Sequence, residues 1–252
     1  IICCSNHYGL IYIAKKCDLY IIPFASIEAR DDILPVKSFP TDIKQIGLSS
    51  SELYLSVTLD ESINIFESRM LKLNPVAATP IHQLSSETFG SFDTTSFTCR
   101  WNKFTSNDIP EKLAVGTSSG VYVTDATKDF VQLSHYNAEV AETFDWCPSA
   151  DKLAISSMNS IHVFGDSLNA PMLTYKDIFE VEDFSDQIHL RHLHWFSESC
   201  MLVARFGHPE NDEDNDVTLE VITLDAGSDT FTCHGLSRDI DKDNWTSESG
   251  WA

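Results

Sequence analysis

The chain has 252 residues, 42% of them hydrophobic, which is enough for one large domain or two small ones with a sizeable core. Its 17 basic and 38 acidic residues give a formal net charge of −21. This balance argues against nucleic-acid binding and against a polybasic membrane-surface role, because both need a basic surface. The charge is uneven: residues 1–126 carry 10 basic and 14 acidic side chains, and residues 127–252 carry 7 and 24.

The start of the chain, Ile1-Ile2-Cys3-Cys4, has the composition of a strand already under way, so we expect an excised piece of a longer protein. No stretch approaches the ~20 apolar residues of a membrane-spanning helix. None of the seven cysteines lies in a CxxC pair, and most lie in apolar stretches. This favours buried free thiols in a reducing compartment. The sequon Asn244-Trp245-Thr246 is then expected to be unused.

A repeat runs through the chain. Trp101, Trp146 and Trp195 each end a short strand, at spacings of 45 and 49 residues. A turn, an apolar strand, another turn and a further strand follow each of them, and weaker copies precede them. Short strands recurring every ~40–50 residues are typical of propeller blades. Because one blade cannot bury both faces alone, neighbouring blades are expected to stack face to face. The alternation at Leu55 and Val57 fits blades buried on their inner faces, and the three tryptophans are predicted to pack in the core between blades.

The pattern predicts an all-β, WD40-like β-propeller, in preference to a β-sandwich, that is incomplete at about five and a half blades. Turns are predicted at Ser49–Ser51, Ser118–Gly120 and Ser149–Asp151. The approximate repeats are 1–30, 42–70, 94–128, 138–168 and 187–226, with the start of another at 230–252. Longer insertions, expected to project from a face or rim, are predicted at 23–41, 69–93, 165–187 and 206–216.

Two acidic loops are the candidate partner-binding sites. The first contains Glu210, Asp212, Glu213, Asp214 and Asp216, and the second contains Glu180, Glu182, Asp183 and Asp186. A calcium loop beginning at Asp212 fails, because position 6 is Val217 and position 12 is Thr223. Two interpretations stay open: solvated insertions, or charges that attract a basic partner.

The other candidate sites are supported by weaker sequence signals. His192 and His194 share one face of a strand, with His189 close by, but no third ligand is identifiable, so no metal site and no cofactor are assigned. Cys233 and His234 are adjacent on a strand and point to opposite faces, so they cannot form a catalytic pair. The sequence contains no GxSxG, P-loop, HExxH or sialidase-type Asp-box motif, and the chain is predicted not to be an enzyme.

Several short motifs resemble one family. The opening Ser5-Asn-His-Tyr-Gly-Leu-Ile-Tyr12 is followed by the strand Asp18–Ile22, and then by Lys37–Pro40 with Ile43–Leu48. Further along come Trp101, Trp146-Cys-Pro-Ser149, His194-Trp195 and Asp243-Asn-Trp245. Together these motifs span nearly the whole chain, and they resemble the N-terminal propeller of the large cytoplasmic-face FG nucleoporins, the CAN family.

The resemblance implies a seven-bladed propeller at the cytoplasmic face of the nuclear pore complex. In that family an acidic surface docks the DEAD-box mRNA-export helicase on the basic face of its first RecA-like domain, in competition with RNA. Contacts with other nucleoporins would lie in regions absent here, without direct nucleic-acid binding or membrane insertion. Asp243 and Glu248 are predicted contact residues because they flank Trp245, near which the family's contact begins. The alternatives are a WD40-like scaffold with another partner and a propeller hydrolase.

Overall fold

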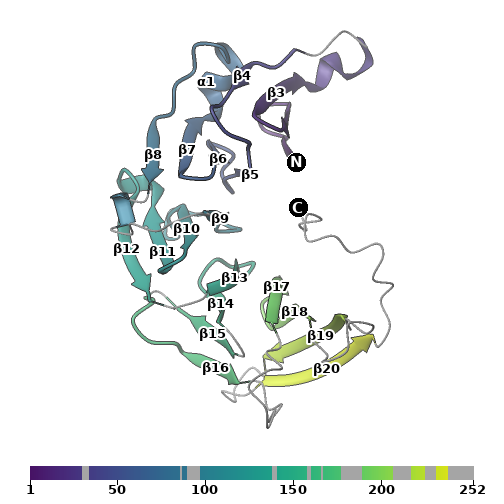
Figure 1. Cartoon of the computed structure of the whole chain (residues 1–252), viewed down its shortest axis with the longest axis vertical. Coiled ribbons are helices and arrows are strands. Elements are labelled where there is room, and N and C mark those ends of the chain that lie inside the picture. Colours follow the sequence, from purple (N-terminus) through teal and green to yellow (C-terminus); the bar gives the residue numbers. More distant parts are fainter. Residues whose placement is uncertain are drawn as a thin grey trace. The chain divides into compact units, whose positions relative to one another are not determined.

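The computed structural model describes residues 1–29, 34–85, 87–89, 97–137, 141–157, 160–165, 167–176, 189–206, 217–224 and 231–237. They form four-stranded antiparallel sheets whose strands lie side by side in chain order, and the sheets also follow one another along the chain (Figure 1). This meander is the architecture of a propeller blade. The predicted all-β, propeller-like fold is confirmed. Among the described residues, no helix has the length and apolarity needed to cross a membrane.

The chain divides into two compact units, and the first comprises residues 1–118 and 122–133. Its first sheet contains β1 (Ile2–Ser5), β2 (Leu10–Lys15), β3 (Asp18–Pro23) and β4 (Lys37–Ser38). The second contains β5 (Gln45–Leu48), β6 (Tyr54–Thr58), β7 (Ser62–Glu67) and β8 (His82–Ser85). The third contains β9 (Thr98–Trp101), β10 (Lys112–Thr117), β11 (Gly120–Asp125) and β12 (Val131–Tyr136). Short helices lie between strands: η1 (Phe24–Ala29), α1 (Ser68–Leu73), η2 (Glu87–Phe89) and η3 (Ala126–Lys128).

The second unit comprises residues 119–121 and 134–251. The fourth sheet contains β13 (Ala141–Trp146), β14 (Leu153–Ser157), β15 (Ser160–Phe164) and β16 (Leu173–Lys176). The fifth contains β17 (His189–Ser197), β18 (Cys200–Phe206), β19 (Val217–Leu224) and β20 (Phe231–Ser237).

The second sheet is buried on both of its faces. Leu55 and Val57 pack with residues of the first sheet such as Tyr12, whereas Ile63 and Ile65 pack with residues of the third sheet such as Trp101. Every residue of β7 except Glu67 is buried as a result. The predicted face-to-face stacking of sheets is therefore confirmed for the second sheet, because a neighbouring sheet covers each side.

Contacts between first strands are close and partly polar. Gly47 of β5 lies against Trp101 of β9, and a Cβ on Gly47 would meet the Ser56 hydroxyl at 2.9 Å. That hydroxyl donates to the Gly47 carbonyl and accepts a hydrogen bond of 3.1 Å from Trp101 Nε1. A side chain at Gly47 would therefore disturb the group that satisfies the buried indole N–H.

The repeated tryptophans lie in the core, as predicted. Trp101, Trp146 and Trp195 are 8%, 3% and 1% exposed, and each stands at or near the end of the first strand of its sheet. In the second unit, Trp195 packs with apolar residues of both the fourth and the fifth sheet. Trp245 and Trp251 lie outside the described residues.

The fourth strands correct the predicted repeats. Phe231–Ser237 is β20, which pairs with β19 and completes the fifth sheet, so Thr230 does not start a sixth repeat. β4, β8 and β16 lie within the predicted insertions 23–41, 69–93 and 165–187, and β12 lies beyond the predicted end of its repeat. These outer strands are mostly exposed or half-buried and carry a weak apolar pattern. The three predicted turns are confirmed, because each joins two strands of one sheet.

A serine–glutamate contact recurs between neighbouring sheets of the same unit. The Ser5 hydroxyl donates to Glu52 at 2.6 Å, Ser51 to Glu111 at 2.7 Å, and Ser149 to Glu198 at 2.6 Å. In each pair the serine lies at the end of the first strand of a sheet or in the turn that follows it. The glutamate lies in the connection between the first and second strands of the next sheet. We call these three pairs the inter-sheet latches.

We predict that Glu111→Ala lowers the free energy of unfolding by about 1–3 kcal/mol, because the Ser51 backbone and hydroxyl donors would lose a buried acceptor. Glu111 is only 5% exposed. Chemical denaturation of both proteins measures the change. Glu61→Ala is the control, since Glu61 is exposed in the turn between β6 and β7. Equal stability of the two variants would contradict a structural role for the latch.

Candidate functional site

The predicted partner-binding residues lie outside the described residues, although the strands that flank them are described. These residues are Glu180, Glu182, Asp183 and Asp186 before β17, Glu210, Asp212, Glu213, Asp214 and Asp216 between β18 and β19, and Asp243 and Glu248 after β20. The register of the fifth sheet shows where the chain enters and leaves each flanking strand.

All three acidic segments join the same end of the fifth sheet. Residues 177–188 lead into His189, which is paired with Phe206. Residues 207–216 connect Phe206 to Val217, which are paired with each other. Residues 238–252 follow Ser237, which is paired with Leu219 of β19. We call this end of the sheet, marked by His189, Phe206, Val217 and Ser237, the acidic end.

The three segments contain fourteen acidic and two basic residues, a large part of the chain's net charge of −21. Negative charges on segments attached to one end of a sheet sum to a negative potential. This potential reaches about one Debye length, ~8 Å at physiological salt. Such a field raises the association rate of a basic partner. Sequence order alone does not show that the three segments are attached to one end of the sheet; the pairing of the flanking strands does.

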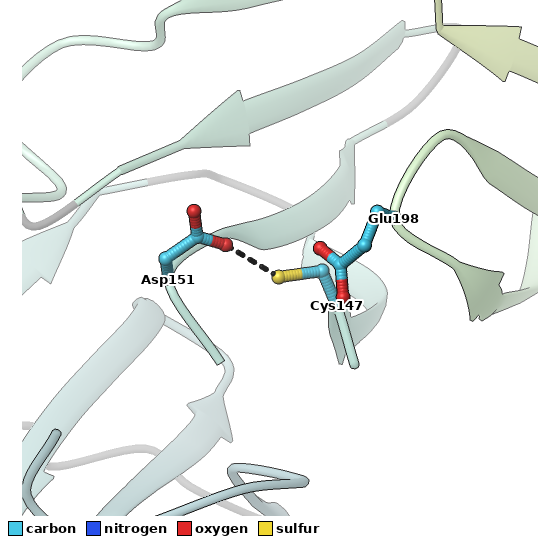
Figure 2. A group of neighbouring side chains, drawn as sticks. All are labelled: Cys147, Asp151 and Glu198. Atoms are coloured by element: carbon cyan, nitrogen blue, oxygen red, sulfur yellow. Dashed lines mark hydrogen bonds between the residues drawn. The ribbon is translucent and has the colours of Figure 1, made fainter. Parts of the chain in front are cut away.

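A second group of chemical interest lies at the opposite end of the fifth sheet. Figure 2 shows Cys147 and Asp151 from the turn between β13 and β14, together with Glu198 from the turn between β17 and β18. The Cys147 sulfur and one carboxylate oxygen of each acidic residue lie within 4.8 Å of one another. Cys147 is fully buried, whereas both carboxylates are exposed. The thiol donates to Asp151 Oδ1 at 2.9 Å.

Hydrogen bonds set the ionisation of this group. Burial, together with the hydrogen bond that it donates to Asp151, raises the pKa of the Cys147 thiol. Burial also opposes ionisation of Asp151, but hydrogen bonds from Cys147, Ser149 and Lys152 outweigh it and lower the pKa of Asp151 to about 2. At neutral pH the cluster therefore holds a protonated thiol beside an ionised carboxylate.

Cys147 occupies a position that has an equivalent in other sheets. Ser49 Oγ accepts from the Tyr54 N–H at 3.1 Å, and Asn102 Oδ1 accepts from the Lys112 N–H at 2.9 Å. Cys147 Sγ likewise accepts from the Lys152 N–H at 3.2 Å. All three residues follow the first strand of their sheet and close the turn into the second. This equivalence could not be predicted from the residue types, because serine, asparagine and cysteine share little beyond the capacity to accept a hydrogen bond.

The remaining candidates have ordinary structural roles where they are described. His194 Nδ1 lies 3.1 Å from Asp145 Oδ2, and the same oxygen accepts from the Trp195 N–H at 2.9 Å. These contacts join β13 to β17. The side chains of His189 and His192 lie outside the described residues. The described cysteines are all free. Only Cys99 and Cys147 are buried and Cys4 is exposed, so the prediction of buried thiols holds for part of the set.

Comparisons with known proteins bear on the fold. No family model and no curated protein matches the chain. Among solved structures, it is similar to Hsv2 of Kluyveromyces lactis with loop 6CD replaced by a Gly-Ser linker, at 14% identity and a TM-score of 0.49, over 94% of this chain and 84% of that one. It is also similar to Hsv2 of Kluyveromyces marxianus, at 15% identity and a TM-score of 0.43, over 95% and 84%. At this level of identity the similarities do not indicate a function, and the fold class follows from the sheet topology.

We predict that Asp151 stabilises the fold only above its depressed pKa. Its folded pKa of about 2 lies below the ordinary 3.8, so its contribution is complete above about pH 5 and is lost as pH falls from about 4 towards 2. The side chain is 52% exposed, so the effect is small and weakens with salt. Denaturation of wild type and Asp151→Asn across this pH range measures it. A difference that stays constant down to pH 2 would contradict the assignment.

Proposed function

We propose that the chain is a non-enzymatic protein-interaction module that docks a basic partner at the acidic end of its fifth sheet. The observation that carries the proposal is the convergence of three acidic segments on that end, with fourteen acidic residues against two basic ones. A partner with a basic face would gain speed of association from this field, and specificity from the contacts made after encounter.

The resemblance to the cytoplasmic-face FG nucleoporins supplies the identity of the partner. In this proposal the partner is the DEAD-box mRNA-export helicase, bound through the basic face that its first RecA-like domain also uses for RNA. The place of action is the cytoplasmic face of the nuclear pore complex. The acidic charge supports a partner of this kind, since a face that binds RNA phosphates is positively charged. The Ser5–Gly9 motif that carries the resemblance has a structural role: Ser5 accepts from the Tyr8 N–H, and Gly9 has a φ of 65°.

We predict that the recombinant chain binds the helicase and that single-stranded RNA competes for this binding. Because steering between charged surfaces is screened by salt, the association rate should fall by about tenfold or more from low to physiological salt. Surface plasmon resonance with immobilised chain, with and without RNA, measures both effects. Absence of binding by the folded chain contradicts helicase docking. Binding that RNA leaves unchanged contradicts docking at the RNA-binding face and favours a scaffold with a different contact.

We predict that neutralising Glu210, Asp212, Glu213, Asp214 and Asp216 to Gln or Asn lowers the association rate by at least about threefold and reduces its salt dependence. The matched control neutralises five exposed residues of the first unit: Asp42, Glu61, Glu87, Asp108 and Asp129. Both variants lose five negative charges, so a general effect of net charge slows them equally. Equal slowing would contradict a specific role for the acidic end.

A further inference from the structure

The connection between β7 and β8 exposes large apolar side chains to solvent. Met70 and Leu73 of α1 are 45% and 68% exposed, and Val76 in the turn that follows is 75% exposed. Leu53 is 44% exposed, and its carbonyl accepts from the Ser68 N–H at 2.8 Å, which places it beside the start of α1. We call Leu53, Met70, Leu73 and Val76 the α1 patch. Single exposed apolar residues are ordinary, but a group of them on one segment indicates a contact surface.

The fold does not require these exposed side chains, because other residues of the same connection fill the core. Leu71 and Ala78 are buried with residues of the first and second sheets. The backbone is held by hydrogen bonds from the Asn74 N–H to the Met70 carbonyl at 2.9 Å and from the Ala78 N–H to the Asn74 carbonyl at 3.0 Å. Lys37 Nζ also donates to the Ala78 carbonyl, at 2.8 Å. The α1 patch is therefore preorganised, which lowers the entropy cost of binding a partner.

The charge around the α1 patch is opposite to that of the whole chain. Residues 68–86 contain no aspartate or glutamate, and this is the longest such stretch in a chain with 38 acidic residues. Arg69 is exposed and has no ion pair with any residue that the structure describes. Lys72 is also exposed, and its ammonium group donates to the Tyr8 carbonyl at 2.9 Å, a neutral acceptor that leaves the positive charge uncompensated. Two exposed cations among apolar side chains are complementary to a partner that is both apolar and acidic.

The same charges separate the kinds of partner that can cover an apolar surface. Electrostatic binding to anionic lipid uses clusters of about four to eight Lys or Arg residues, whereas the α1 patch has two among its residues, in a chain of net charge −21. A symmetric contact between two copies of the chain would bring Arg69 and Lys72 of one copy against the same cations of the other. A protein segment that carries carboxylates next to its apolar side chains meets neither obstacle.

We propose that the α1 patch docks a protein segment whose large apolar side chains alternate with carboxylates. The apolar side chains of the segment cover Leu73 and Val76, and its carboxylates pair with Arg69 and Lys72. The apolar contacts supply most of the affinity, and the ion pairs at the rim orient the segment. This interaction is independent of helicase docking, because it uses residues of the first unit and selects a partner of the opposite charge.

Fluorescence anisotropy with the full 252-residue chain tests the proposal. The probe is a labelled peptide of about 15 residues in which leucine recurs every three or four positions among glutamates; the matched peptide carries lysine in place of glutamate. The acidic peptide should bind saturably, and added salt should weaken its binding, because the ion pairs are exposed. Leu73→Ser with Val76→Ser, the patch variant, should weaken this binding by at least about tenfold. The lysine peptide reports attraction to the acidic segments instead, so the patch variant should bind it as the wild type does.

The matched control is Val131→Ser with Leu133→Ser, which removes two exposed apolar side chains of β12 and should leave binding of the acidic peptide unchanged. Arg69→Gln with Lys72→Gln should weaken that binding and reduce its salt dependence. Circular dichroism checks that each variant is folded. The absence of saturable binding of the acidic peptide, or equal binding by wild type and patch variant, would overturn the proposal.

Two further measurements test the other occupants of the α1 patch. Flotation with phosphatidylcholine vesicles that contain phosphatidylserine measures membrane binding, and analytical ultracentrifugation measures self-association. We expect neither interaction to depend on the α1 patch. Vesicle binding that is lost in the patch variant would overturn the proposal in favour of a membrane, and a dimer that is lost in the patch variant would overturn it in favour of a second copy.

Discussion

The structure depends on one constraint: the second sheet carries apolar residues on both faces, so it needs a neighbouring sheet on each side. β6 and β7 bury residues on both sides, with Leu55 and Val57 towards the first sheet and Ile63 and Ile65 towards the third. Burial of apolar area contributes about 25 cal/mol per Å², so each sheet is stabilised mainly by its neighbours. The repeat in the sequence is consistent with this stacking, since each repeat supplies one sheet with an apolar face for its neighbour.

Stacking brings the first strands so close together that their polar groups need partners across the sheet boundary. Side chains supply these partners. The Gln45 amide bonds both the N–H and the carbonyl of Cys99, and Asp145 accepts from the Trp195 N–H. The three inter-sheet latches also join neighbouring sheets, in the turns that follow the first strands. Because an unsatisfied buried polar group costs about 1–3 kcal/mol, these bonds restrict how one sheet can sit against the next within each unit.

Sequence reasoning succeeded where burial leaves a pattern. The strands that end in Trp101, Trp146 and Trp195 could be predicted because they are apolar and recur at similar spacing. β4, β8, β12 and β16 could not, since outer strands are half-exposed and their composition is close to that of a loop. The latches are also hidden, because Ser51 and Glu111 are 60 residues apart and neither residue type is unusual in a turn. The acidic residues could be identified from the sequence, but only the strand register of the fifth sheet shows that their segments are attached to one end of it.

The two ends of the fifth sheet place different demands on structure. At the acidic end, a screened field depends mainly on how many charges lie within a Debye length, so it tolerates variation in the position of any one carboxylate. At the opposite end, a bond to sulfur or to a shared hydroxyl depends on tenths of an ångström. Cys147, Ser149 and Asp151 are held by backbone bonds within one tight turn, from the Cys147 N–H to the Lys152 carbonyl and from the Ala150 N–H to the Cys147 carbonyl. The contacts of Cys147, Ser149 and Asp151, which need exact geometry, are thus formed in a turn fixed by the sheet, whereas the acidic charge, which needs only proximity, is carried by the segments attached to the strands.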